Sequence, residues 1–124
     1  MKRNVCVRTC GRLVLVAGFL ATVGFSGEAT ARQCGAASWY GDKFAGKRTA
    51  SGVRFNPNDM VAAHRSLPFG SRVRVTDRRT GRSVTVKIVD RGPYARGRVI
   101  DVSKAAARKL GFLRRGTTSV CITR

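Results

Sequence analysis

The amino-acid sequence predicts a small, mainly β protein, in which five to six short strands close into a barrel beside one short helix. Three observations support this prediction. Short apolar runs alternate with polar residues at a period of two, which is typical of strands with one buried face. Glycine-rich turns separate these runs, and a single stretch near the C-terminal end carries helical signals instead. In a chain of 124 residues, many short strands joined by turns favour a barrel over a sandwich.

Residues 1–31 are expected to be a secretory signal peptide, separate from the domain at 32–124. They combine a basic start, an apolar run at 13–25 and an A-x-A cleavage signal at 29–31. The apolar run, about thirteen residues, is shorter than the roughly 20 that a membrane span needs, so no transmembrane anchor is expected. Nor does a lipobox precede Cys34. We therefore expect a soluble, monomeric domain that is exported to the periplasm or secreted.

Residues 84–103 hold the densest set of signals, because strand, turn, strand and helix cap follow one another around two carboxylates. Residues 84–89 alternate in the strand pattern, and this strand ends at Asp90, directly before Arg-Gly-Pro. A second β-branched run at 99–102 carries Asp101. The sequence therefore predicts that two carboxylates leave two strand ends.

The one helix is predicted at 104–110, with Ser103 as its N-cap and Gly111 as the residue that ends it. Residues 42–55 are rich in glycine and polar side chains, and are expected to form a long surface loop of the kind that often carries function. Further strands are expected at 33–41, 60–64, 72–77, 82–89 and 117–123, with 72–77 and 82–89 forming a hairpin.

Trp39 and Tyr40 are neighbours in the first expected strand, so they should point to opposite faces of the sheet. One of them would then face a groove, where an aromatic ring can stack on the apolar face of a sugar. The alternative is that Trp39 belongs to the core and Tyr40 is partly exposed.

Cys34 and Cys121 lie near opposite ends of the expected mature domain, whereas Cys6 and Cys10 leave with the signal peptide. In an oxidising compartment such a pair most simply forms a disulfide, which would stabilise the domain by roughly 2–4 kcal/mol and place the first and last strands side by side. A metal or redox pair is a poorer alternative, because there is no C-x-x-C and His64 is the only histidine. No metal or cofactor is expected.

The expected mature domain is strongly basic, with 21 Lys and Arg against five Asp, which gives a net charge of +16. Such a surface attracts polyanions. For an exported protein these are anionic wall and envelope polymers rather than nucleic acid. Because the charges are spread along the chain, a solvated basic surface that aids solubility and adhesion to the wall is the simpler interpretation.

Five strings stand out along the chain: ASWYG at 37–41, RTASG at 48–52, AAHRSLPFG at 62–70, DRGPY at 90–94 and VIDVS at 99–103. In this order and spacing they closely resemble the RlpA-like (rare lipoprotein A) double-psi β-barrel proteins. The resemblance implies a six-stranded double-psi β-barrel with one or two short helices, akin to expansins, barwin-like proteins, family 45 endoglucanases and the MltA type of lytic transglycosylase. It also implies a peptidoglycan lytic transglycosylase, which cleaves the β-1,4 bond between N-acetylmuramic acid and N-acetylglucosamine and leaves a 1,6-anhydro end.

The resemblance implies that Asp90 and His64 are essential for this reaction, and that Asp101 matches the catalytic Asp of expansin-like relatives. Thr49 would line the same groove. One departure is that RlpA-like sequences usually carry a Glu directly after T-A-S-G, where this chain has Val53. The missing carboxylate supports the alternative, a non-catalytic expansin-like or barwin-like module that binds wall glycan.

A lytic transglycosylase needs only one acid, which protonates the leaving oxygen and then takes the proton from the C6 hydroxyl that attacks the anomeric carbon. We expect Asp90 to be this group, with His64 positioning it or the sugar and Asp101 shaping the groove. The alternative is that Asp90 only bonds the amides of its own turn and Asp101 only supports the helix start. The residues expected to bind substrate are Thr49, Trp39, Tyr40, Arg91, Tyr94 and Arg96, with the arginines facing muramic carboxylates.

Overall fold

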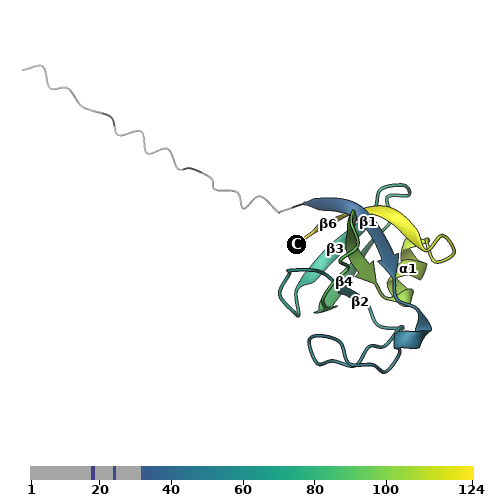
Figure 1. The fold of residues 1–124 in the computed structure, drawn as a ribbon. Coiled ribbons are helices and arrows are strands. Elements are labelled where there is room, and N and C mark those ends of the chain that lie inside the picture. Colours follow the sequence, from purple (N-terminus) through teal and green to yellow (C-terminus); the bar gives the residue numbers. More distant parts are fainter. Residues whose placement is uncertain (1–17, 19–23, 25–31) are drawn as a thin grey trace, which may run out of the picture.

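A computed structural model describes residues 32–124, together with Gly18 and Gly24. The expected signal peptide therefore lies outside the described residues, apart from those two glycines, and stays a prediction. In the described part of the chain no helix has the length and apolar character to cross a bilayer. The elements, shown in Figure 1, are β1 (Gln33–Trp39), the 3-10 turn η1 (Asp42–Phe44), β2 (Val61–Ala63), β3 (Arg72–Asp77), β4 (Ser83–Asp90), β5 (Arg98–Val102), α1 (Lys104–Leu110) and β6 (Thr117–Thr123).

The six strands close into one barrel in the order β1-β5-β2-β4-β3-β6, which confirms the predicted fold class. β1 and β5 are parallel, as are β2 and β4, and the other neighbours are antiparallel. Because parallel neighbours cannot be joined by a tight hairpin, the chain crosses the barrel between them. The long connection at 42–60 joins β1 to β2, which are separated in the barrel by β5, and Figure 1 shows it below the barrel.

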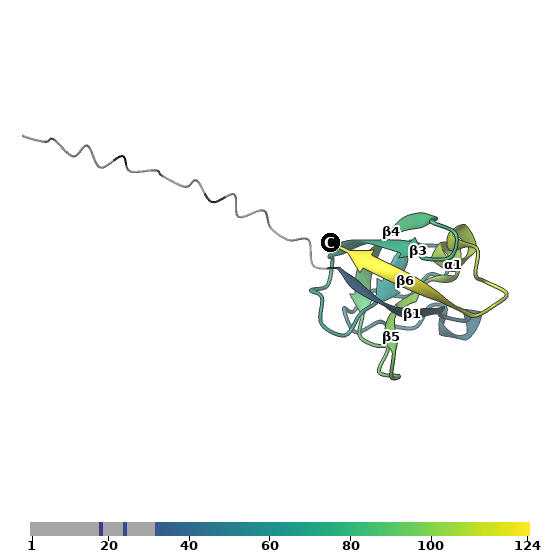
Figure 2. The same cartoon turned by 90° about the horizontal axis from the view of Figure 1, so that it is seen from above.

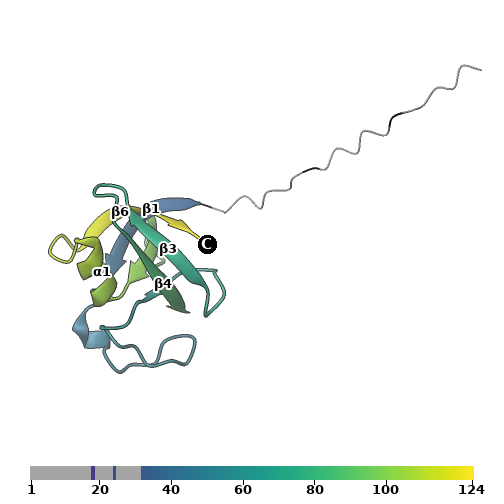
Figure 3. The same cartoon turned by 180° about the vertical axis from the view of Figure 1, so that it is seen from behind.

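The core is built from the alternating apolar residues of the strands, as the period of two predicts. Val73 pairs with Val86 and Val75 with Val84 across the β3–β4 hairpin, and all four are buried. Figure 3 shows these two strands running side by side. Each such side chain contributes about 1.5–3 kcal/mol when it is fully buried.

Helix α1 packs against β4 and β1 and begins and ends where the sequence predicts. The hydroxyl of Ser103 accepts a hydrogen bond from the Ala106 N–H at 3.3 Å, which satisfies one of the free amides of the first turn. Gly111 ends the helix with a φ of 86°, a left-handed conformation that glycine adopts at little cost.

The predicted disulfide between Cys34 and Cys121 is present, with the two Cα atoms 4.0 Å apart. The two cysteines are direct cross-strand partners in β1 and β6. These first and last strands lie side by side, as Figure 2 shows. The bridge therefore closes the domain near its two ends.

Strand register places the two carboxylates of the sequence prediction at one level of the barrel wall. Ala63 of β2 pairs with Asp90 of β4 on one side and with Asp101 of β5 on the other. Ser38 of β1 pairs with Asp101 in turn. Since neighbouring strands are about 4.8 Å apart, the backbones at Asp90 and Asp101 are separated by two spacings, roughly 10 Å.

Candidate active site

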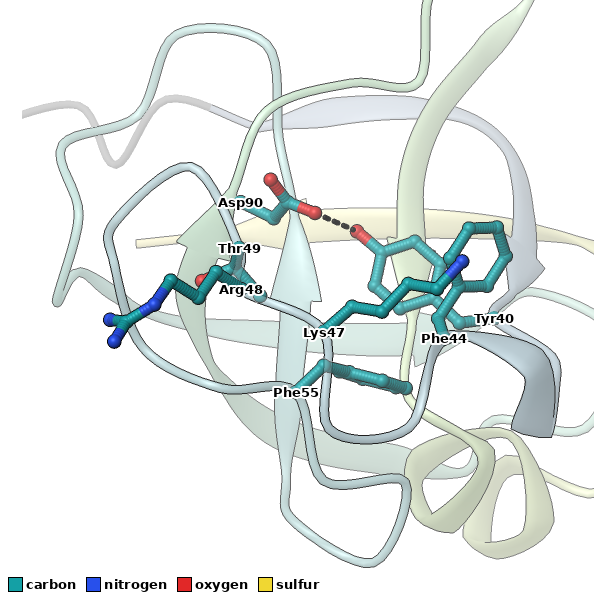
Figure 4. A pocket seen from close by; sticks show the side chains of 7 residues that line it. All are labelled: Tyr40, Phe44, Lys47, Arg48, Thr49, Phe55 and Asp90. Carbon is teal, nitrogen blue, oxygen red and sulfur yellow. Dashed lines mark hydrogen bonds between the residues drawn. The ribbon is translucent and has the colours of Figure 1, made fainter.

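Asp90 ends β4, and its carboxylate is held by three neutral donors. Its Oδ1 accepts from the backbone N–H groups of Ala50 and Arg91, both at 2.9 Å. Its Oδ2 accepts from the hydroxyl of Tyr40 at 3.4 Å, the bond drawn in Figure 4. The half-buried carboxylate lines a pocket and has no cation within 4.0 Å among the described residues. Its position is therefore fixed without neutralisation of its charge.

The loop that supplies the Ala50 amide is a small hairpin closed by a bridge between Arg48 and Arg54. Gly52 makes its turn with a φ of 88°. The Ser51 N–H donates to the carbonyl of Val89 at 3.1 Å, so the hairpin is attached to the end of β4 twice. This attachment explains why the long, glycine-containing loop of the sequence prediction lies at the carboxylate.

Thr49 lines the pocket, as the resemblance implies, but its hydroxyl serves the hairpin. It donates to the carbonyl of Val53 at 2.7 Å and lies 3.0 Å from the hydroxyl of Ser51. The Val53 side chain itself is 52% exposed and lines a separate groove over β4. Residue 53, where RlpA-like sequences usually carry Glu, thus does not line the Asp90 pocket.

An aromatic wall forms the rest of the pocket. The ring of Tyr40 meets Phe55 edge-on at 4.9 Å between centroids and lies 5.8 Å from Phe44. The ammonium of Lys47 lies 5.6 Å from the Phe44 centroid, and Figure 4 shows Arg48 pointing away from the carboxylate. Sequence reasoning missed Phe44, Lys47, Arg48 and Phe55 as lining residues of this pocket, and its only signal for them was the length of the loop that carries them.

Tyr40 is the pocket residue with the most perturbed ionisation. Burial raises the pKa of its hydroxyl far above the usual value of 10.0, and the negative charges of Asp90 and Asp101 raise it further. The phenol therefore stays protonated over the whole physiological range. It remains a hydrogen-bond donor to Asp90 whatever the state of the carboxylate.

Asp101 has a different environment from Asp90, although the two share one level of the barrel. Its Oδ1 forms an ion pair with the guanidinium of Arg98 and accepts a hydrogen bond from Ser38. The Asp101 carboxylate is thus already engaged by a guanidinium and a hydroxyl and does not line the pocket. The geometry therefore favours a supporting role for Asp101.

The three other described carboxylates lie outside the pocket. Asp42 pairs with Lys104 at 2.9 Å, Asp77 is fully buried beneath the β3–β4 turn, and Asp59 is exposed beside the groove that Val53 lines. Within residues 32–124, His, Cys, Asp and Glu side chains do not gather in a group of three that could hold a metal ion. Asp90 is thus the described carboxylate that meets an aromatic-lined pocket.

The imidazole of His64 is 5% exposed and is held by its own turn. Its Nδ1 accepts from the N–H groups of Ser66 and Leu67, both at 3.1 Å. Its Nε2 therefore carries the proton and donates to Gln33 Oε1 at 2.9 Å. The ring does not contact the Asp90 carboxylate; the link is the His64 N–H, which donates to the Asp90 carbonyl at 3.2 Å.

The environment of His64 also favours the neutral form of its ring. Burial lowers its pKa from the usual 6.5, and the positive charges of Arg91 and Arg65 lower it further. A neutral ring is what its hydrogen bonds require, because a protonated Nδ1 could not accept from two amides. In the folded protein His64 thus fixes the turn after β2, which lies beside Asp90.

Of the residues expected to bind sugar, Tyr40 lines the pocket and Trp39 does not. The Trp39 ring packs against the core, and its indole N–H donates to the Leu113 carbonyl at 3.2 Å. The neighbouring aromatics therefore do point to opposite faces. Tyr94 and Arg96 lie on the exposed loop between β4 and β5, 76% exposed in the case of Tyr94.

Both curated sequences and solved structures of known proteins are similar to this chain. A family model described as lytic transglycolase matches residues 32–122. A probable endolytic peptidoglycan transglycosylase RlpA of Nostoc sp. is 63% identical over 90 residues, which cover 71% of this chain and 24% of the relative. The endolytic peptidoglycan transglycosylase RlpA of Neisseria meningitidis is 53% identical over 90 residues, which cover 73% of this chain and 38% of the relative. The chain thus spans less than half the length of these curated relatives.

Among solved structures, a mutant expansin of Clavibacter michiganensis in complex with cellohexaose has the same fold. The TM-score is 0.60 at 22% sequence identity, and the match covers 76% of this chain and 50% of the expansin. At this level of identity the likeness concerns the fold alone. It supports the double-psi β-barrel that the sequence motifs imply.

Proposed function

Because the chain belongs to the lytic transglycolase family of RlpA-like double-psi β-barrels, we propose that it cleaves the β-1,4 bond between N-acetylmuramic acid and N-acetylglucosamine and leaves a 1,6-anhydro end. The names of the relatives support the reaction, since both are peptidoglycan transglycosylases. The observation that carries the proposal for this chain is the geometry of Asp90. Its carboxyl group opens into a pocket and is oriented by neutral donors only.

The hydrogen bonds of Asp90 indicate which oxygen carries the proton. A carboxyl group has about four lone-pair sites, and two N–H donors already occupy Oδ1. Oδ2 has one long bond from Tyr40 and therefore keeps a site for a proton. In the first step the acid form of Asp90 gives this proton to the glycosidic oxygen as the bond from the anomeric carbon to that oxygen breaks.

In the second step the same carboxylate acts as base. The C6 hydroxyl of the muramic residue attacks its own anomeric carbon, and Asp90 takes the hydroxyl proton as the new C–O bond forms. One group is thus acid and then base, its proton is restored, and no water is consumed. The Tyr40 hydroxyl keeps donating to Oδ2 in both states, which holds the carboxyl plane in place.

The aromatic pocket wall is suited to the apolar face of a sugar ring. Tyr40 and Phe44 present their rings beside the carboxylate, the buried Phe55 supports Tyr40 from behind, and Lys47 adds a positive charge at the rim. We assign Asp101 and Arg98 to the support of the groove and His64 to positioning Asp90 through the backbone. Trp39 has a structural role in this proposal, because its contacts are with the core.

The cellular setting follows from the sequence expectation of export. A protein of the periplasm or the wall meets peptidoglycan, and the basic surface would hold it on anionic wall and envelope polymers. The alternative function is a wall-binding module that does not cut glycan. It is supported by the likeness of fold to expansin and by Val53, which stands where RlpA-like sequences usually carry Glu. Because Val53 lies outside the Asp90 pocket, that departure removes no carboxylate from the pocket itself.

The test is incubation of the mature protein with purified sacculi, followed by mass spectrometry of the released fragments. We expect 1,6-anhydro muropeptides from the wild-type protein. Asp90→Asn should release none, because an amide can neither give nor take the proton, and Asp101→Asn should retain partial activity. Intact binding to sacculi without any anhydro product would rule out the enzyme and leave the binding module.

A further inference from the structure

We propose that Phe69, Arg91 and Tyr94 form a second sugar-binding subsite beside Asp90, which holds a glycan strand beyond the two sugars of the cleaved bond. This inference rests on the proposed function and extends it to a longer substrate. We call the three residues the Phe69–Tyr94 platform. It is separate from the aromatic wall of the pocket, because none of its residues lines that pocket.

The platform consists of large side chains that are left uncovered. Phe69 is 41% exposed and Tyr94 is 76% exposed, the largest exposed fraction among the big apolar side chains of the described residues. The guanidinium of Arg91 lies 3.9 Å from the centre of the Phe69 ring and stacks on it. Exposed aromatic rings are suited to the C–H face of a pyranose, and the guanidinium beside them adds polar contacts.

Two arginines hold this exposed surface rigid. Nη1 of Arg91 donates to the carbonyls of His64 and Leu67 at 3.3 and 2.8 Å, which ties it to the turn that carries Phe69. In the opposite direction, Arg65 reaches from that turn and donates to the carbonyl of Pro93 at 2.5 Å.

Arg65 also donates to the carbonyls of Ala95 and Arg98, at 2.9 and 3.3 Å. The turn at 64–70 and the loop at 91–97 are thus braced against each other from both sides. A surface that is already ordered before binding loses less conformational freedom when the ligand arrives. Rigid presentation of exposed rings is therefore what a binding surface requires.

The platform is continuous with the reacting carboxylate. The Arg91 N–H is one of the donors to Asp90 Oδ1. Gly92 follows with a φ of 115°, and a Cβ atom built on it would lie 3.8 Å from Cε2 of Tyr94, so the tyrosine ring lies over this glycine. A strand bound with its scissile bond at Asp90 would therefore meet the platform at the neighbouring sugars.

The test compares the binding of short and long strands in the Asp90→Asn protein, which removes turnover. Isothermal titration would use peptidoglycan glycan strands of one and of four disaccharide units. Phe69→Ala and Tyr94→Ala should each weaken binding of the long strand by about 2- to 12-fold, which corresponds to the 0.5–1.5 kcal/mol of one aromatic contact. Binding of the single disaccharide should not change.

Three control variants make the result specific. Phe69→Tyr and Tyr94→Phe keep an aromatic ring and should keep the long-strand affinity, whereas Val53→Ala removes exposed apolar surface in another groove and should have no effect. Unchanged affinity for the long strand in both alanine variants, or an equal loss for short and long strands, would overturn the subsite. Because binding is measured without turnover, absence of anhydro product from the wild-type protein would overturn the proposed function and leave this result standing.

Discussion

At the scale of single residues, the site combines a phenol that stays protonated with a carboxyl group that the phenol helps to orient. Burial and the two nearby carboxylates raise the pKa of Tyr40, so its O–H donates to Asp90 at every pH where the protein works. The hydroxyl is thus a fixed part of the orientation of Asp90. Its ring is held independently, by edge contact with Phe55 and by Phe44.

Tyr40→Phe should separate these two contributions. The phenylalanine keeps the ring contacts, while the carboxylate loses one donor. A hydrogen bond to a charged group contributes about 1.5–3 kcal/mol, and the Tyr40 bond is long at 3.4 Å, so the lower end of this range applies. The rate of anhydro product formation should fall by about 10-fold, and the free energy of unfolding by no more than about 1.5 kcal/mol. Tyr94→Phe, an exposed tyrosine on the platform, is the matched control and should keep the rate. Equal rates for both variants would show that the Tyr40 hydroxyl does not position Asp90.

His64 makes the stability of the fold depend on pH. Its pKa is lowered in the folded protein, so between that lowered value and 6.5 the unfolded chain binds more protons. The stability that the neutral ring contributes is fully present above pH 6.5, and is lost as the pH falls through the folded-state pKa. Protonation also breaks the bonds that Nδ1 accepts from Ser66 and Leu67.

His64→Asn removes this titration while it keeps an acceptor for the two amides. In urea unfolding at pH 7.5 and pH 5.0, the wild-type protein should lose more stability on acidification than the variant. The five aspartates of the domain are common to both proteins, so the difference isolates the histidine. An identical loss in both proteins would mean that His64 does not control the acid side of the stability profile.

At the scale of elements, the barrel and the hairpin at 48–54 have separate tasks. The barrel sets the level of Asp90, because strand register pairs it with Ala63 of β2. The hairpin then fixes the carboxylate through one amide, that of Ala50. Strain in the hairpin should therefore disturb the site before it disturbs the core.

Gly52→Ala introduces such strain, since Gly52 has a φ of 88° and an added Cβ would meet nothing within 4 Å. The cost is conformational only, about 1–2 kcal/mol for a left-handed residue that is not glycine. We expect a clear loss of activity with a small change in melting temperature. Gly81→Ala, at a φ of 76° in the β3–β4 turn and equally free of contacts, should carry the same strain without loss of activity. Equal activities would show that the hairpin does not orient Asp90.

Local signals predicted the elements of the barrel, because strand alternation, the Ser103 cap and the Gly111 end depend on neighbours in sequence. They also placed Asp90 at a strand end and Trp39 and Tyr40 on opposite faces, whereas the role expected of Asp90 rested on the family resemblance. They could not predict that Lys47 and Phe44 line the pocket, because the position of that loop is set by hydrogen bonds to residues about 40 positions away in the chain, such as Ala50 to Asp90. For the same reason, the separation of the His64 ring from the carboxylate could not be seen in the motif that contains it.

At the scale of the whole molecule, charge is the least balanced property. The domain carries a net charge of +16, yet only two ion pairs occur among its described residues. At one end of the barrel, the β3–β4 turn lies against the last strand and the end of α1. The Arg78 N–H donates to the Ser119 carbonyl, and a Cβ atom on Gly111 would lie 2.8 Å from Nη1 of Arg82.

This basic end should lower the stability of the free protein, because like charges repel each other and the nearest carboxylate, Asp77, is already bound within the turn. Replacing Arg78, Arg79 and Arg82, which all belong to this turn or follow it directly, by glutamine should therefore raise the melting temperature in low salt.

The gain should shrink in 0.5 M NaCl, where the screening length falls to about 4 Å. Binding to sacculi at low salt should weaken in the same variant, because the anionic wall polymers have fewer arginines to pair with. Lys104→Gln is the control and should not raise the melting temperature. Lys104 is paired with Asp42 at 2.9 Å, so its removal relieves little repulsion. A triple variant that is less stable than the wild type, or a gain in stability that salt does not reduce, would mean that these arginines stabilise the fold instead of repelling one another.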